Sequence, residues 1–493
     1  MVELAGHRSR DDQIEPLAYQ WRQISGPSIT ISNRNRSKAT FVAPEVSDDS
    51  TIVVTLTVTD SQGLTDTDNV TIHVNDVNEI VCEANVDSRC YYSGPGATGD
   101  GSFKNPGSIE SLIPQLSRGD YLYLRGGVYT DYYRVTSAES IINLEKYVNF
   151  SDPQPTVTQP VTIKGYPDEQ VTIRGDLTKG CVHIDGISNL VLQDMRIENC
   201  FNKGVRVGYD IPEENITLRN IEFANMEYYD DSGFLYVHSY DNVVIENCQF
   251  HDYIPKAGTD QVGAYVKFYR ATNITVRHNE FYGQGAGIYY KHGETTPGSG
   301  GYTRIHDNYF HDLTGSGNLS SIDTNQNRTE IYNNRFINTG GVRVHREDGT
   351  SPPFTTGVEI SYNTFVGGTL YLADGSNDGS YMSAYGLGAK SANIHHNVFS
   401  DTQYRVWTYG SDVEFNEGIN LSSDHNCYYS STGEYKINYF AAEGSWGDLG
   451  DNYALSDWQA LTYGANSIEG IPLLDEHGIQ QSGSPCLGIG YSP

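Results

Sequence analysis

Residues 264–293 read AYVKFYRATNITVRHNEFYGQGAGIYYKHG, and their pattern decides the fold. Two short segments within them, 264–269 and 286–291, alternate their side chains with the period of two that is typical of a β-strand. The turn-rich connection between the segments carries the tripeptide Asn-Glu-Phe at 279–281. The pattern predicts two strands, one from each of two neighbouring coils, that stack in parallel.

The Asn–aromatic turn recurs along the chain, each time after an apolar–x–apolar segment. The asparagines are Asn199, Asn220, Asn247, Asn279, Asn308, Asn334, Asn363, Asn397 and Asn426. A repeat of this length indicates a solenoid in which each repeat is one coil with loops of variable length. We expect roughly ten coils, an asparagine hydrogen-bond ladder at the turn and stacked aromatic rings in the interior.

Residues 1–79 read as a separate all-β module with alternating segments and a turn signal at 60–63. Four motifs stand out: Tyr19-Gln20-Trp21, Ser25-Gly26-Pro27, Ala43-Pro44-Glu45 and Val58-Thr59-Asp60. On these motifs the module resembles the PKD-like family of immunoglobulin-type β-sandwiches. The resemblance implies a spacer or weak binder whose first strand is missing before Val2.

Residues 80–493 are predicted to form one solenoid domain with a cap at each end. Residues 109–116 read as a short amphipathic helix over an apolar core, an opening that resembles that of secreted right-handed parallel β-helix proteins. After Tyr429 the repeat ends, and Trp446, Trp458 and a turn at 482–485 predict a C-terminal cap. The predicted fold is all-β: a right-handed parallel β-helix preceded by a small immunoglobulin-like β-sandwich.

The composition limits the possible partners. The formal charge is −30, from 62 acidic and 32 basic residues, which argues against nucleic acid or an anionic membrane as a partner. No apolar run approaches the ~18–20 residues of a membrane span. We expect a secreted or cell-surface monomer, extracellular or periplasmic, without membrane insertion.

Seven cysteines fit an oxidising compartment. Cys82 and Cys90 are close enough in the sequence to form a disulfide, whereas Cys200 and Cys248 follow the same Glu-Asn dipeptide and are expected to be buried thiols. No cysteine pair has zinc-site spacing. For residues 75–79, a calcium site and a solvated acidic linker both remain open.

Outward residues of successive strands, placed in register, gather cations and tyrosines on one face. The face carries His183, Asp185, Arg206, Tyr236, His238, Tyr265, Lys267, Tyr269, Tyr289, Lys291, Ser321, Asp323, Arg343 and His345, with Arg346 close by. Cations gathered against a net charge of −30 indicate an anionic ligand, and the tyrosines add stacking surfaces. An acidic polysaccharide is the ligand class that fits.

Cleavage of a uronate chain by β-elimination requires removal of the C5 proton, which becomes acidic only when the adjacent carboxylate is neutralised. We predict Lys267 as the base, with Lys291, Arg343 and His292 as neutralisers and His345 as a further catalytic candidate. Tyr265, Tyr269 or Tyr289 could protonate the leaving oxygen. The predicted substrate-binding residues are Arg206, Tyr236, His238, Tyr265, Tyr269, Tyr289, His292, Asp323 and Arg346.

At these residues the chain resembles polysaccharide lyase family 6, the chondroitinase B and alginate lyase group. Val266-Lys267 matches the Val-Lys strand of the family's catalytic lysine, and Lys291-His292-Gly293 occupies the place of its Arg-His-Gly motif. Lysine in place of arginine removes the bidentate fork for a carboxylate. The family's two calcium acids become Val262 and Asp260, so Asp260 is the single metal candidate. We expect no cofactor, or Ca²⁺.

Two rival functions remain open. A β-helix glycoside hydrolase would use paired carboxylates ~5–10 Å apart, and the candidates are Asp323 with Glu347, Asp348 or Asp374. The non-enzymatic rival is a glycan-binding solenoid with a PKD-like spacer. An unsaturated product would separate a lyase from a hydrolase, and the absence of any product would favour the binding protein.

Overall fold

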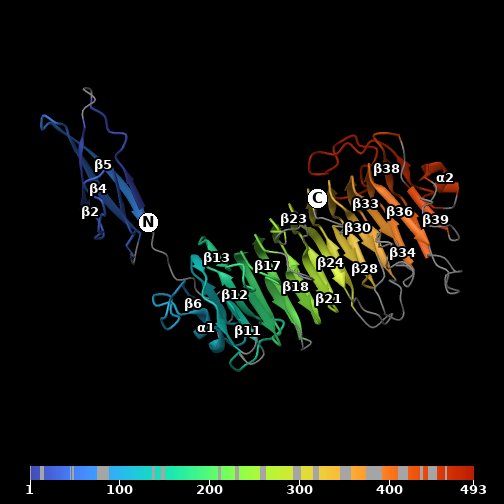
Figure 1. The fold of residues 1–493 in the computed structure, drawn as a ribbon, viewed down its shortest axis with the longest axis horizontal. Coiled ribbons are helices and arrows are strands. Elements are labelled where there is room, and N and C mark those ends of the chain that lie inside the picture. The colour runs from blue at the N-terminus through green and yellow to red at the C-terminus, as the bar shows by residue number, and fades with distance from the viewer. Residues whose placement is uncertain are drawn as a thin grey trace. The chain divides into compact units, whose positions relative to one another are not determined.

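The structure is a computed structural model of the chain. It describes residues 2–11, 16–44, 46, 49–74, 88–135, 139–145, 150–208, 213–227, 233–255, 263–291, 301–314, 321–344, 357–372, 391–408, 420–433, 437–441, 452–460 and 463–492. The chain divides into two compact units, Met1–Glu83 and Ala84–Pro493, and each is described by itself. Figure 1 colours the first unit blue.

The first unit is a small antiparallel β-sandwich. Strand β1 (Val2–Ala5) pairs with β3 (Lys38–Phe41), and β2 (Ala18–Ser25), β4 (Ser50–Thr59) and β5 (Thr65–Val74) form a second sheet. Alternate side chains of β4 enter the core, where they pack with a tryptophan of β2. The all-β nature expected for this segment is confirmed.

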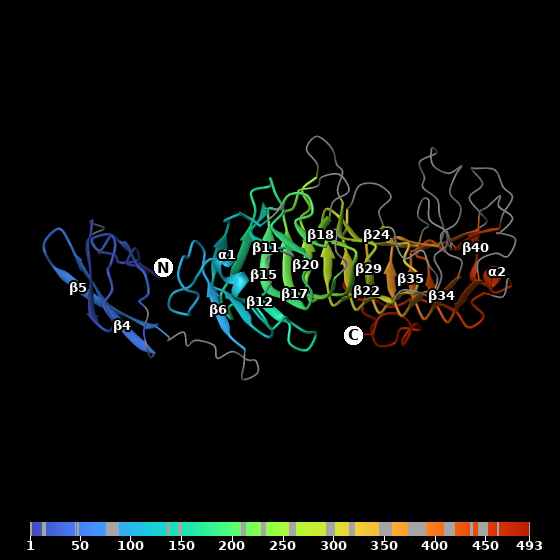
Figure 2. The same cartoon turned by 90° about the horizontal axis from the view of Figure 1, so that it is seen from below.

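The second unit is a parallel β-helix built from two large sheets, and Figure 2 shows its coils stacked in chain order. Among the described residues, twelve strands form one sheet: β11 (Ile142–Glu145), β14 (Val182–Asp185), β16 (Val205–Val207), β18 (Gly233–His238), β21 (Ala264–Tyr269), β24 (Ala286–Lys291), β27 (Ile322–Thr324), β30 (Gly341–Val344), β33 (Thr369–Leu372), β36 (Gln403–Thr408), β39 (Ile437–Ala441) and β40 (Asn452–Tyr453). From β11 to β39 each strand pairs in parallel with the strand of the next coil.

The other large sheet has 22 strands within the described part of the chain. They are β6 (Cys90–Ser93), β7 (Tyr121–Leu124), β8 (Gly127–Tyr129), β12 (Val161–Gly165), β13 (Val171–Arg174), β15 (Leu190–Glu198), β17 (Glu213–Ala224), β19 (Tyr240–Glu246), β20 (Gln249–His251), β22 (Thr272–Arg277), β23 (Glu280–Tyr282), β25 (Thr303–His306), β26 (Tyr309–His311), β28 (Thr329–Tyr332), β29 (Arg335–Ile337), β31 (Val358–Ser361), β32 (Thr364–Val366), β34 (Ser391–His395), β35 (Val398–Ser400), β37 (Asn420–Asp424), β38 (Cys427–Tyr429) and β41 (Ile468–Glu469). A short antiparallel pair, β9 (Tyr133–Arg134) and β10 (Glu139–Ser140), lies outside both sheets.

The interior contains the aromatic stack that the repeat predicts. The rings belong to Phe223, Phe250, Phe281, Phe310, Phe336, Phe365, Phe399 and Tyr428, one per coil. Successive ring centroids lie between 4.6 and 5.3 Å apart, close to the spacing of neighbouring strands. The stack therefore fixes the register of each coil on the next.

The asparagine ladder is shorter than the sequence predicts. Its members are Asn279, Asn308, Asn334, Asn363, Asn397 and Asn426, and each of the first five donates from Nδ2 to Oδ1 of the next. Asn220, within β17, and Asn247, at a bend, are instead exposed residues with φ of 51° and 55°, and Asn199 lies at another positive-φ bend. The prediction is wrong for these three. Asn220 and Asn247 each have one extra residue before the aromatic, and Cys248 takes the ladder position. In the coil of Asn199 the register places Ile197, not Phe201, beside Phe223 of the aromatic stack.

Two disulfides lie within the described residues of the solenoid, Cys181–Cys200 and Cys427–Cys486. Cys200 is therefore not the buried thiol expected from the sequence, whereas Cys248 is, and burial raises the pKa of its thiol to about 12. Cys90 is disulfide-bonded, and its predicted partner Cys82 lies outside the described residues.

The N-terminal helical cap is present as predicted. Helix α1 (Ile109–Leu112) continues as the 3-10 turn η1 (Ile113–Gln115), and their buried faces join the apolar core. Ser108 begins the helix, because its side chain accepts a hydrogen bond from the backbone N–H of Ser111.

At the other end, helix α2 (Leu455–Ala460) buries Trp458 edge-on against Tyr404, 5.9 Å between ring centroids. Trp446, predicted to share in this cap, lies outside the described residues. No helix of the described chain is long and apolar enough to cross a membrane.

From β41 onward the chain runs back along the outside of the β-helix, and we call residues 468–492 the return segment. Ser492 exchanges two hydrogen bonds with Asn333 of an earlier coil, and the carbonyl of His477 accepts from Nη1 of Arg335 at 3.0 Å. Figures 1 and 2 both place the end marked C beside the middle coils. The return segment thus covers coils that are far from it in the sequence.

Candidate functional site

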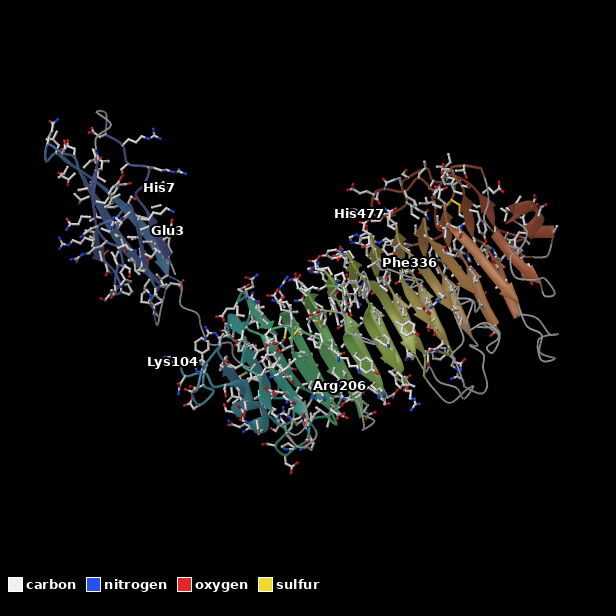
Figure 3. The ribbon with its side chains drawn as sticks, viewed as in Figure 1. Glu3, His7, Lys104, Arg206, Phe336 and His477 are labelled. Atoms are coloured by element: carbon white, nitrogen blue, oxygen red, sulfur yellow. A yellow bond between two sulfur atoms is a disulfide. The ribbon has the colours of Figure 1, made fainter. Side chains whose placement is uncertain are left out.

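One row of side chains runs across the twelve-stranded sheet and points away from the core. We call it the central row; its described members are Asn143, His183, Arg206, Tyr236, Lys267, Tyr289, Asp323 and Arg343. Each is the Cα partner of the next, and its neighbours along the strand face the apolar core. Figure 3 labels Arg206 on this sheet. The structure therefore brings together six of the predicted site residues, Arg206 to Arg343.

A second row lies two residues further along the strands and contains His238, Tyr269 and Lys291. Lys291 is the partner of Tyr269, and Lys267 is the partner of Tyr289, so the two lysines are diagonal neighbours. The offset of two residues corresponds to about 6–7 Å along a strand. The imidazole of His238 stacks on the ring of Tyr269 at 4.6 Å.

Lys267 lies at the centre of the central row and is 4% exposed. Its Nζ lies 5.2 Å from the ring centroid of Tyr289, in a cation–π contact. Tyr236, its partner on the preceding coil, is equally buried and receives Nζ of Lys203 at 4.4 Å from its ring centroid. The side chain of Lys267 points away from the apolar core, as predicted, but neighbouring residues bury it from solvent.

Arg343 and Asp323 form an ion pair at the C-terminal end of the described central row. Nε of Arg343 donates to Oδ2 of Asp323 at 2.9 Å, and Nη2 donates to the same oxygen. The carboxylate is 1% exposed and the guanidinium side chain 20%. The pairing makes Asp323 a poor general acid for a hydrolase, because a neighbouring cation favours the ionised form of a carboxyl group.

His183 is the second member of the central row, beside Asn143. Its Nδ1 is 3.6 Å from Oε1 of Glu145, a buried residue of β11. Burial, with a smaller contribution from the charge of Arg206, lowers the pKa of His183 to about 4. His183 is therefore neutral near pH 7, where it can take part in hydrogen bonding but adds no charge to the row.

The structure corrects the predicted position of Tyr265, which was expected on the outward face. Its ring is fully buried, packs edge-on against Phe234 at 4.9 Å, and its hydroxyl donates to the carbonyls of Tyr282 and Gln284. Burial raises the pKa of this phenol further above its usual value. The side chain turns inward because Gly285 leaves the space: a Cβ there would lie 2.6 Å from Cζ of Tyr265. Tyr265 therefore neither contacts substrate nor donates a proton.

Sequence reasoning missed three residues of this surface. Glu145 continues the outward alternation of β11, Lys203 lies just before β16, and Arg270 packs its guanidinium on Tyr269 at 5.3 Å. The alternating pattern of residues 142–145 could have identified Glu145 from the sequence. Lys203 and Arg270 occupy positive-φ bends at strand ends, where the alternation of side chains along a strand does not predict which way a side chain points.

Several predicted residues lie outside the described part of the chain: His292, His345 and Arg346, the metal candidate Asp260, and the hydrolase candidates Glu347, Asp348 and Asp374. Residues 75–79, the other calcium candidate, are outside it as well. The described residues contain no group of three or more His, Cys, Asp or Glu side chains that could hold a metal ion.

Two segments of the chain match known families. Residues 1–74 match the family described as K319L-like, PKD domain, and residues 169–299 match the family described as Right handed beta helix region. The predicted PKD-like module and the predicted right-handed β-helix are therefore confirmed. No curated protein matches the chain.

Solved structures with a similar fold have low sequence identity to this chain. XylC in complex with xylose gives a TM-score of 0.43 at 9% identity, covering 71% of this chain and 85% of XylC. Pectate lyase Pel9A gives a TM-score of 0.39 at 11% identity, covering 80% of this chain and 88% of the lyase. A mannuronic acid specific polysaccharide family 6 lyase from human gut microbiota gives a TM-score of 0.33 at 12% identity, covering 78% of this chain and 92% of that lyase. At identities this low, the chemistry has to be argued from the residues of the site.

Proposed function

We propose that the protein cleaves an acidic polysaccharide by β-elimination on the twelve-stranded sheet. The observation that carries the proposal is Lys267, an enclosed lysine between two tyrosines in a row that also holds Arg206 and Arg343. Cations gathered on one face of a chain of net charge −30 favour the binding of an anion there. A uronate or sulfated chain is the substrate class that uses both the cations and the aromatic rings.

Lys267 acts as the base in this mechanism. An amine accepts a proton only in its neutral form, and both burial and neighbouring cations favour that form of a lysine. The neutral Nζ takes the C5 proton of the uronate, and the C5–H electron pair becomes the C4–C5 double bond as the C4–oxygen bond breaks. The departing oxygen takes a proton from Tyr289 or Tyr269, both on the outward surface.

The cations around Lys267 neutralise the substrate carboxylate. Lys291 lies diagonally across from Lys267 and carries a compact charge on the adjacent coil. Arg343 is partly neutralised by Asp323, so it contributes directed N–H donors more than net charge. Preorganised donors of this kind stabilise the charge that develops on the enolate-like intermediate.

The Cys181–Cys200 and Cys427–Cys486 disulfides support an extracellular or periplasmic location, because such bonds persist in oxidising compartments. The substrate is a polyanionic glycan, and the PKD-like module serves as spacer. Of the carboxylates considered for hydrolysis, Asp323 is the one within the described residues, and it is enclosed and ion-paired.

The test is a panel of acidic polysaccharides, with alginate, glycosaminoglycans, pectin and sulfated algal glycans, followed by ultraviolet absorbance of the unsaturated product. We expect one class to yield such a product, at a rate that falls with salt as the Debye length shrinks to ~3 Å at 1 M. Saturated oligosaccharides would identify a hydrolase instead. Binding of a glycan without any product would identify a non-catalytic solenoid.

A further inference from the structure

A histidine pair on the 22-stranded sheet lies outside the proposed polysaccharide site. His395 ends β34, and His396 follows it at a bend with φ of 56°. Their Nδ1 atoms lie 2.9 Å apart, with the rings nearly perpendicular at 88°. One proton at most fits between two nitrogens at that distance, so one Nδ1 donates and the other offers a lone pair.

Neighbouring groups hold both rings in place. Nε2 of His395 lies 3.4 Å from Oε1 of Glu359 on the preceding coil, which favours the tautomer with its proton on Nε2 and leaves Nδ1 as the acceptor. The ring of His396 lies between those of Tyr362 and His425, 4.9 Å from each centroid. Carboxylate support on the far nitrogen of an imidazole is the usual second contact of a metal-bound histidine.

We propose that His395 and His396 chelate a divalent transition-metal ion through their Nδ1 atoms, with Cu²⁺ or Ni²⁺ as the fitting class. Two ligands at right angles on metal–nitrogen bonds of about 2.0–2.1 Å are about 2.8–3.0 Å apart. The observed separation of 2.9 Å matches that arrangement. The ion takes the place of the single proton between the nitrogens, and that proton moves to Nε2 of the same ring, so that both imidazoles bind the ion in their neutral form.

Charge and accessibility agree with the proposal. Both rings are part-exposed, and the side chain of His395 is 23% exposed. The carboxylates of Glu359 and Asp424 face the cluster and compensate the added charge. Because the described residues hold no larger ligand group, water completes the coordination shell.

The test is calorimetric titration of the untagged full-length protein with Cu²⁺, Ni²⁺ and Ca²⁺ in a non-chelating buffer. We expect one saturable site for Cu²⁺, weaker binding of Ni²⁺ in line with the usual affinity order, and none for Ca²⁺ at this pair. His396→Asn and His395→Ser should each weaken Cu²⁺ binding about tenfold or more. Glu359→Gln should weaken it about tenfold through loss of the contact to His395.

The variants are chosen to preserve the fold. Asparagine already occupies the bend equivalent to His396 at Asn333, and Ser361 is the strand partner of His395. His477→Asn is the matched control, an exposed histidine of the return segment that Figure 3 labels. It should bind Cu²⁺ like the wild type. Cu²⁺ should raise the melting temperature of the wild type and of this control only. The absence of saturable Cu²⁺ binding, or unchanged affinity in both pair variants, would overturn the proposal.

Discussion

The guanidinium of Arg343 is fixed by the enclosed carboxylate of Asp323, its partner on the neighbouring strand, through two N–H donors to one oxygen. An arginine held in this way has few orientations left, so its remaining donors keep a constant direction along the central row. Preorganised donors stabilise developing charge without having to reorganise during the reaction. Asp323 therefore matters for the position of Arg343 rather than as an acid.

The ion pair can be measured by a double-mutant cycle of Asp323→Asn and Arg343→Gln in urea unfolding. Removal of either partner leaves the other without its charge partner, so each single variant should lose about 1.5–3 kcal/mol of unfolding free energy. The double variant should lose clearly less than the sum of the two. Strict additivity would mean that the contact contributes nothing to stability.

Replacement of the proposed base tests the mechanism directly. Lys267→Ala should lower the elimination rate by about 10²–10⁴-fold, because the step loses its proton acceptor. Lys267→Arg should fail too, since a guanidinium stays protonated near neutral pH. Lys104→Ala, at an exposed lysine of the N-terminal coils, is the control for loss of a positive charge. Near wild-type activity of Lys267→Arg would place the base elsewhere.

Lys291 is expected to neutralise charge and not to move a proton. Lys291→Arg should retain or improve activity, because arginine offers a bidentate fork to a carboxylate. Lys291→Ala should lose activity, because one of the positive charges nearest to Lys267 is removed. Both variants are compared by kcat and KM on the polysaccharide identified in the panel. Equal rates for the alanine variant and the wild type would remove Lys291 from the mechanism.

The pair His311–Glu280 predicts a pH-dependent part of the stability. Nε2 of His311 lies 3.1 Å from Oε1 of Glu280, and this contact raises the pKa of the histidine and lowers that of the glutamate. The histidine contribution is complete below its unfolded pKa of about 6.5 and is lost as pH rises through the folded value. The glutamate contribution is complete above its unfolded pKa of about 4.3 and is lost as pH falls through the folded value.

The stability difference between the wild type and His311→Gln should therefore be largest between about pH 4.5 and 6.5, and should shrink by about pH 8.5. Both side chains are partly exposed, so solvent screening keeps the effect modest. Urea unfolding at a series of pH values measures it. The matched control is Gln284→Ala, at an exposed uncharged residue, which should change stability equally at every pH.

Chelation of calcium tests the cofactor prediction. Since Asp260 alone remains of the two acids at the positions where the related lyases hold calcium, we expect EGTA to leave most of the activity intact. A melting curve taken in parallel shows whether the fold survives the treatment. Complete loss of activity that calcium restores, with an unchanged melting curve, would show that the reaction depends on the ion.

The sequence predicts the coil and its interior well, because one physical requirement repeats in every coil. Each phenylalanine from Phe223 to Phe399 stacks on the next, so an aromatic residue has to recur once per coil. The ladder prediction failed at Asn247 because one extra residue before Phe250 moves this asparagine out of line with Asn279, so that Cys248 occupies the ladder position.

The candidate site was predictable as a row but not in its contacts. Alternation placed Lys267, Asp323 and Arg343 on one face, because strand periodicity fixes the direction of each side chain. The burial of Lys267 and the Asp323–Arg343 ion pair depend on coil register across loops of unequal length, which one sequence does not encode locally. Tyr265 turned inward because a glycine of the next coil leaves room for its ring.

The return segment changes how this solenoid can come apart. A stack of coils held only by nearest neighbours can fray from either end, one coil at a time. Here Cys486 is bonded to Cys427, and Ser492 is hydrogen-bonded to Asn333, so the last coils are bridged to a coil well inside the stack. The C-terminal third should open as a single cooperative block, which leaves the N-terminal coils as the place where stepwise unzipping begins.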